Sequence, residues 1–243
     1  MKLILCGGGW AEKTVVPNKI FESLIEPHKP ILYIPQARDR DPAGYITCKT
    51  WLLGEFKNIK HGEIDTLESL SEVIHKNLSD YAAIFIGGGN TFKLLKELKE
   101  SGAFNKIQEY INNGGLVYGC SAGACIFGKD IDICLYADPN LVELKDTSGF
   151  NSVFGFSLAA HYTNQNAERT QLETDFLTEY SHKEPVIALP EEDSLYINGD
   201  TVEVIGTRPY YVFNQGNRMQ FEPNVKYKTD EFIRTVKKII NII

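Results

Sequence analysis

Short apolar segments alternate with longer amphipathic segments through the first half of this 243-residue chain. Each apolar segment lies near Gly or Pro, which is typical of a buried strand; the four are KLIL, ILYI, AAIFI and LVY, at residues 2–5, 31–34, 82–86 and 116–118. Between them, apolar residues recur at helical spacing and predict helices at 66–78, 92–98 and 104–111. This alternation predicts an α/β fold, with a mainly parallel sheet that carries helices on both faces.

The second half of the chain has a different pattern. Two more buried strands are expected at 157–161 (SLAAH) and 185–189 (PVIAL), with a helix at about 166–180 between them. Short strands at 194–197, 202–205 and 210–213, with Asn-Gly after the first, predict a region of β-hairpins. Residues 230–243 predict a terminal helix that docks on the protein or forms the face of a homodimer. Because no linker interrupts the chain, we expect one domain over residues 1–243.

Charge and composition narrow the partners that the chain is expected to bind. The formal net charge is -7 and no block of Lys or Arg occurs, which argues against nucleic acid and against anionic membranes. No segment approaches the ~20 apolar residues of a membrane span. The start, MKLILCGGGW, lacks the basic and long apolar parts of a signal peptide, so we expect a cytoplasmic protein. The five cysteines make no CxxC pair and no His lies at ligand spacing from one, so we expect buried cysteines and no zinc.

The segment GGLVYGCSAGACIFG has the layout of a nucleophile elbow: an apolar strand, a turn of small residues and the start of a helix. The positions two before and two after the nucleophile must be small, because strand and helix pass close together there. These positions are Gly119 and Gly123 if the nucleophile is Ser121. If it is Cys120, the preceding position is the bulky Tyr118. The spacing therefore favours Ser121, although a thiolate is intrinsically more nucleophilic.

A serine of ordinary pKa needs a general base. His161 ends the apolar run FSLAAH and precedes polar YTNQN, so we expect it at a strand tip on the same sheet edge as the elbow. An orienting carboxylate is offered by Glu191, just after VIALP, and by Asp138 in LYADPN; the residues alone do not choose between them. The remaining histidines have charged or loop neighbours and are interpreted as surface residues: His28, His61, His75 and His182.

The reaction also needs donors for a developing oxyanion. The amide of Ala122 follows the nucleophile and is the first candidate. The glycines of IFIGGGNTF follow a predicted strand, and their backbone amides are expected to point into the site. This loop lacks both the Walker lysine and the G-x-G-x-x-G spacing, and the early CGGGW is only a weak dinucleotide signal. We therefore interpret CGGGW as a place where the backbone approaches the site closely.

GGGNTF and GCSAGA on one chain resemble the peptidase E family of serine peptidases, relatives of cyanophycinase with a class I glutamine amidotransferase-like fold. The likeness runs over about 82–195, through IGGGNTFKLLKEL, GCSAGA, HYTN and LPE. The resemblance implies a cytosolic exopeptidase that removes an N-terminal aspartate from small peptides, without metal or cofactor. The site residues that it implies are the nucleophile Ser121, the base His161, the oxyanion donors Gly89 and Ala122, and the substrate-binding residues Gly88, Asn90 and Arg169. For the third triad member it offers Glu191 or Asp138, and we favour Glu191.

The chain departs from the family pattern in one place that bears on specificity. LPEED replaces the usual LPEG, so Glu192 and Asp193 are expected near the site, where they would repel acidic substrates or bind a free α-amino group.

Three alternatives to an aspartyl dipeptidase stay open. They are cyanophycinase-like hydrolysis of β-aspartyl-arginine, glutamine amidotransfer through Cys120, and a small-molecule-binding protein that keeps the fold without the chemistry.

Overall fold

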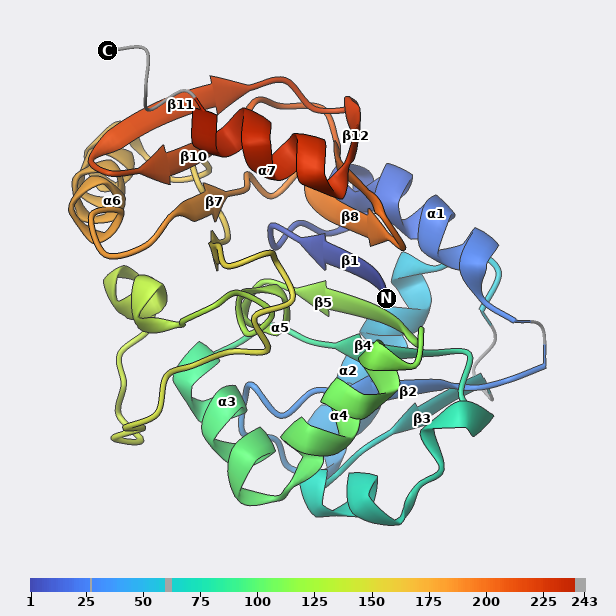
Figure 1. Ribbon diagram of the computed structural model, residues 1–243. Coiled ribbons are helices and arrows are strands. Elements are labelled where there is room, and N and C mark those ends of the chain that lie inside the picture. Colours follow the sequence, from blue (N-terminus) through green and yellow to red (C-terminus); the bar gives the residue numbers. More distant parts are fainter. Residues whose placement is uncertain (27, 60–62, 239–243) are drawn as a thin grey trace.

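A large mixed sheet forms the centre of the computed structural model, which describes residues 1–26, 28–59 and 63–238 (Figure 1). Its parallel part consists, in spatial order, of β1 (Lys2–Cys6), β5 (Leu116–Cys120), β4 (Ala83–Ile86), β2 (Ile31–Ile34) and β3 (Ile64–Thr66). Beyond β1 the sheet continues with antiparallel strands, β8 (Ser194–Asn198), β9 (Thr201–Ile205) and β12 (Lys226–Lys228). The prediction of a mainly parallel sheet is confirmed.

Helices cover both faces of this sheet, as predicted (Figure 1). The helices concerned are α1 (Val15–Leu24), α2 (Pro42–Glu55), α3 (Thr91–Glu100) and α4 (Ala103–Asn112). Successive residues of a strand point to opposite faces. In β1, Ile4 packs in the apolar cluster that includes residues of α1 and α2, whereas Leu3 and Leu5 pack in the cluster that includes α3 and α4. The sheet therefore has an apolar core on each face and leaves its strand ends for the site.

The later strands form a second, smaller sheet. In spatial order it contains β11 (Asn217–Phe221), β10 (Tyr210–Asn214), β7 (Val186–Ala188) and β6 (Ser157–Ala159). The predicted helix at 166–180 is confirmed as α6 (Ala167–Tyr180), which links β6 to β7. The expectation that His161 ends a strand of the elbow's sheet is wrong, because the strand that precedes it, β6, pairs with β7 in the smaller sheet. His161 still reaches the elbow, since its amide donates to the Gly7 carbonyl at 2.8 Å.

The helix predicted at 66–78 is replaced by the end of β3 and two 3₁₀ helices, η3 (Leu70–His75) and η4 (Leu78–Asp80). The buried residues Leu67, Leu70 and Val73 recur every three positions, which suits the three-residue turn of a 3₁₀ helix. Ser69 and Glu72 form a capping box that starts η3.

The terminal helix is confirmed as α7 (Thr229–Lys238), and residues 239–243 of the predicted segment lie outside the described residues, as does His61. Phe232 and Val236 are buried, so the apolar face of α7 is docked on its own chain. In the part of the chain that the structure describes, no helix is both long enough and apolar enough to cross a membrane.

Candidate active site

Ser121 occupies a sharp turn between β5 and the short helix α5 (Ala122–Cys125). Its φ of 54° and ψ of -117° lie where L-residues are rarely found, so the turn is strained. The turn is held on both sides: the Ser121 amide donates to Cys6, and the Ser121 carbonyl accepts from Ala124 and Cys125. The strained backbone sets the serine side chain at the end of the strand, where the elbow pattern places a nucleophile.

The glycines beside Ser121 are required by close backbone contacts. A Cβ on Gly119 would lie 2.2 Å from the Gly123 carbonyl oxygen, and a Cβ on Gly123 would lie 2.2 Å from the Ile86 carbonyl oxygen. This crowding leaves no room for a side chain at either position, and Ser121, unlike Cys120, has glycine at both. Cys120 is also buried, with 7% of its surface exposed. Its hydrogen bond with Cys6 and, to a lesser extent, its burial raise the pKa of its thiol well above the ordinary value, which disfavours a thiolate.

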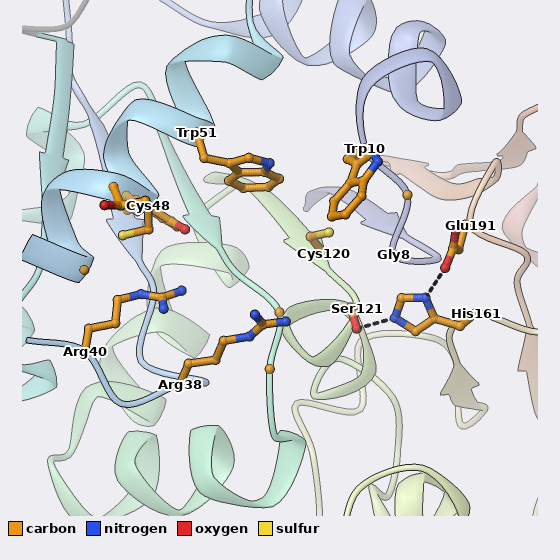
Figure 2. Close-up of a pocket in the computed structure, with 16 residues that line it drawn as sticks. Gly8, Trp10, Arg38, Arg40, Cys48, Trp51, Cys120, Ser121, His161 and Glu191 are labelled. Carbon is orange, nitrogen blue, oxygen red and sulfur yellow. Dashed lines mark hydrogen bonds and ion pairs between the residues drawn. The ribbon is translucent and has the colours of Figure 1, made fainter.

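Ser121, His161 and Glu191 form a continuous hydrogen-bonded series (Figure 2). Ser121 Oγ lies 2.8 Å from His161 Nε2, and His161 Nδ1 lies 2.8 Å from Glu191 Oε1. The other carboxylate oxygen of Glu191 accepts from Lys13 Nζ at 2.5 Å. Burial acts to raise the pKa of Glu191, but the hydrogen bonds from Lys13 and His161 bring that pKa below its ordinary value. Glu191 is therefore ionised at neutral pH beside the imidazole.

The glycines of CGGGW pack against this series. Gly8 has a φ of +108°, and a Cβ there would lie 2.1 Å from His161 Cε1. A Cβ on Gly9 would lie 2.1 Å from the Glu191 carbonyl oxygen. The Glu191 amide is fixed by the side chain of Asn164 at 2.7 Å. The expected close backbone approach at CGGGW is therefore an approach to the histidine and the glutamate.

Asp138 has a different environment from Glu191. Its Oδ2 accepts from the Thr91 amide at 2.8 Å and from Thr91 Oγ1 at 2.6 Å, at the start of α3. The side chain of Asn90 lies nearby, where it accepts from the Lys93 amide of α3 and donates to the Pro139 carbonyl. The structure therefore brings Glu191, and not Asp138, to the imidazole, because the Asp138 carboxylate is already held by the helix.

The glycine loop after β4 lies against Ser121. A Cβ on Gly88 would lie 3.0 Å from Ser121 Cβ, and Gly89 has a φ of +151°. Within the described residues, the amides of Gly88, Gly89 and Ala122 donate no hydrogen bond. Free amides beside the serine are what a developing oxyanion requires.

Three cavities adjoin the series; the smallest, of about 170 Å³, is bordered by Ser121, Ala122 and Asp138, and the other two differ in size. The larger, of about 570 Å³, is bordered by Ser121 and His161 and by four side chains that the sequence analysis missed: Trp10, Arg38, Arg40 and Trp51 (Figure 2). Arg38 and Arg40 follow β2, and residues beyond the carboxyl ends of parallel strands are common ligand contacts, so a signal was present. Trp51 lies on α2, which no sequence pattern singled out.

The smaller cavity, of about 230 Å³, is bordered by His161, Arg169, Glu173 and Glu191. The Arg169 guanidinium lies 3.4 Å from the Tyr136 carbonyl and retains free donors. Glu173 is 3% exposed, and burial raises its pKa to about 7. Opposite charges therefore border the cavity beside the imidazole.

The last two acidic residues of LPEED, Glu192 and Asp193, are held within the protein. Glu192 accepts from Asn164 and pairs with Arg208 at 3.4 Å, and Asp193 Oδ1 accepts from two backbone amides. Internal donors thus hold Glu192 and one oxygen of Asp193, and neither residue borders the three cavities described above. No group of three or more His, Cys, Asp or Glu among residues 1–26, 28–59 and 63–238 is arranged to hold a metal.

Comparison with known proteins places this geometry in a family. The model of peptidase family S51 matches residues 3–205. The peptidase E of Shewanella sp. (strain ANA-3) is 34% identical over 141 residues, and the match spans 56% of this chain and 58% of that relative's length. A protein from Listeria monocytogenes EGD-e, described as a candidate peptidase E, has a TM-score of 0.64 and 29% identity over 85% of this chain and 98% of its own.

A crystallised peptidase from an acI-B1 Actinobacterium has a TM-score of 0.69 and covers 93% of this chain and 96% of its own; at 20% identity it shows the fold alone. The match to the family model includes the elbow, the glycine loop, the histidine and the glutamate. The chain belongs to peptidase family S51.

Proposed function

We propose that this protein is a cytoplasmic serine exopeptidase that removes an N-terminal aspartate from short peptides, without a metal or cofactor. The observation that carries the proposal is the series Ser121–His161–Glu191, with 2.8 Å at each hydrogen bond to the imidazole. Such a series activates a serine hydroxyl, which is otherwise a weak nucleophile at neutral pH.

In the acylation step, His161 Nε2 takes the proton of Ser121 Oγ as that oxygen attacks the carbonyl carbon of the first residue. The amides of Gly89 and Ala122 donate to the oxyanion that develops. The peptide C–N bond then breaks, and His161 gives its proton to the leaving amine. The ionised Glu191 carboxylate stabilises the imidazolium and keeps Nδ1 protonated.

In the deacylation step, water attacks the ester carbon and His161 takes its proton. The tetrahedral intermediate collapses, and the proton returns to Ser121 Oγ as the free amino acid leaves. The same two amides serve both oxyanions, so no group has to move between the two half-reactions.

Specificity for aspartate is assigned to the smaller cavity. A guanidinium binds a carboxylate through parallel hydrogen bonds, so Arg169 suits the aspartate side chain. Glu173, which borders the same cavity, suits the free α-ammonium group. Arg169 and Glu173 thus offer a cation and a carboxyl group to an N-terminal aspartate, which carries both opposite charges.

Hydrolysis of paired dipeptides tests this function. Wild type and Cys120→Ala should cleave Asp-Leu, and Ser121→Ala should lose about 10⁴–10⁶ in kcat. Arg169→Ala should reduce the preference for Asp-Leu over Ala-Leu. Retained activity in Ser121→Ala, or cleavage of β-Asp-Arg with none of Asp-Leu, would overturn the proposal.

A further inference from the structure

Two arginines in the larger cavity have no anionic partner among the residues that the structure describes. Arg38 and Arg40 both border the cavity, and within the described residues neither makes an ion pair. The acidic residues interleaved with them are used elsewhere: Asp39 pairs with Lys93 at 3.2 Å, and Asp41 accepts from the Gly44 amide at the start of α2. Glu191 also borders the cavity but is paired with Lys13, so the two arginines leave the cavity positively charged in a chain whose net charge is -7.

The guanidinium of Arg40 is partly withdrawn from water. Its Nε is buried and makes no hydrogen bond within the described part of the chain. A buried donor that lacks a partner costs free energy, and a charged donor costs more. Figure 2 shows the Arg38 and Arg40 side chains on one side of the cavity, with Arg38 reaching toward Ser121. A planar anion that bridges the two guanidiniums would supply the missing acceptors.

Two tryptophans border the same cavity. Trp10 is 63% exposed and Trp51 is 37% exposed, although indoles usually bury most of their surface. Figure 2 shows both rings on the side of the cavity across from the guanidiniums. An apolar or aromatic group placed against these rings would be removed from water while an attached anion meets the arginines.

This inference rests on the proposed peptidase function. We propose that the larger cavity binds the second residue of a dipeptide: Arg38 and Arg40 hold its C-terminal carboxylate, and Trp10 and Trp51 contact its apolar side chain. Size supports the assignment, because the cavity of about 230 Å³ at Arg169 suits the small aspartyl residue, whereas about 570 Å³ leaves room for a large second side chain. The favoured substrate is then a dipeptide with aspartate first and a large apolar residue second.

Binding can be measured without hydrolysis. Trp10 and Trp51 are the only tryptophans in the chain, so their fluorescence reports on this cavity. In a Ser121→Ala background, Asp-Phe should bind about tenfold or more tightly than Asp-Phe amide, because only the acid offers a charged acceptor. Arg38→Gln and Arg40→Gln should each reduce that ratio toward one. Arg234→Gln, on the exposed surface of α7, is the matched control and should leave it unchanged.

The second residue is tested by turnover in the active enzyme. Trp51→Ala should reduce the preference for Asp-Phe over Asp-Gly in kcat/KM and leave the preference for acid over amide in place. The arginine variants should leave the preference for Asp-Phe over Ala-Phe in place, since that preference belongs to the smaller cavity.

Two results would overturn the assignment. One is equal binding of Asp-Phe and its amide. The other is an arginine variant that no longer prefers Asp-Phe to Ala-Phe but still prefers Asp-Phe to Asp-Phe amide. Arg38 and Arg40 would then bind the aspartate side chain and not the C-terminal carboxylate. Absence of hydrolysis with the acid-over-amide ratio intact would contradict the proposed peptidase function and leave the carboxylate site standing.

Discussion

At the scale of single residues, the two carboxylates near the elbow have separable roles. Glu191 accepts from His161 Nδ1, whereas Asp138 caps α3 through Thr91. We predict that Glu191→Gln lowers kcat on Asp-Leu by about 10²–10⁴, because the imidazolium loses its anionic partner. Asp138→Asn should keep the activity and lose about 1 kcal/mol of unfolding free energy through its weakened cap. Initial rates and urea unfolding check both variants, and the reverse order of activities would assign the triad to Asp138.

Glu173 gives a pH-dependent prediction. Burial raises its pKa from 4.5 to about 7, so the folded protein holds this proton more tightly than the unfolded chain does. The resulting stabilisation is fully present below pH 4.5 and is lost as the pH rises through 7. Glu173→Gln cannot ionise, so it should be more stable than wild type by about 1–3 kcal/mol at pH 8 and nearly equal to it at pH 4. Urea unfolding at both pH values checks this, and a difference independent of pH would contradict it.

At the scale of elements, the loop after β1 positions the base. Gly8→Ala would put a Cβ 2.1 Å from His161 Cε1 at a φ of +108°, so we expect it to displace the imidazole and to lower kcat at least about 10²-fold. Gly54→Ala on α2 is the matched control, because no atom lies within 4 Å of its added Cβ. It should keep the activity and add about 0.5–1 kcal/mol of stability. Steady-state kinetics with thermal unfolding checks the pair, and full activity in Gly8→Ala would remove the loop from the account.

The sequence predicts elements better than it predicts how they pair. Continuous apolar runs identify the parallel strands, because both faces of these strands are buried. The split into two sheets could not be predicted, since it depends on β8 taking the free edge of β1 from a distant part of the chain. The segment 66–78 is predicted as an α-helix because a three-residue repeat over so short a range resembles the helical one.

The site was predictable to the extent that local spacing determines it. The flanking glycines distinguish Ser121 from Cys120, and the apolar run before His161 points to a strand end. The choice of Glu191 depends on which carboxylate α3 already holds, and that is visible only in three dimensions. Arg38 and Arg40 had a signal, because both follow the end of β2. Their importance is visible only in the structure, where neither makes an ion pair within the described residues.

At the scale of the whole molecule, α7 joins the two sheets. Phe232 packs against Phe156, just before β6, and against Tyr227 of β12. Because His161 follows β6 while Ser121 follows β5, the triad requires both sheets to keep their positions. We predict that Phe232→Ala lowers the unfolding free energy by about 3–5 kcal/mol.

In Phe232→Ala, activity should be lost at the temperature at which the protein unfolds, since the packing of Phe232 supports both the fold and the triad. Leu172→Ala on α6, where the side chain is 65% exposed, is the control and should change stability by less than about 0.5 kcal/mol. Circular dichroism and residual activity along one temperature series check the prediction. Equal unfolding temperatures for the two variants would contradict a joining role for α7.

Covalent labelling tests whether His161 and Glu191 make Ser121 a nucleophile. Folded protein is treated with a fluorophosphonate, and the adduct is located by peptide mass spectrometry. We predict one adduct, on Ser121, that is slowed by Asp-Leu and abolished in His161→Ala. Folded wild-type protein that remains unlabelled, or that carries the adduct on another residue, would contradict the claim.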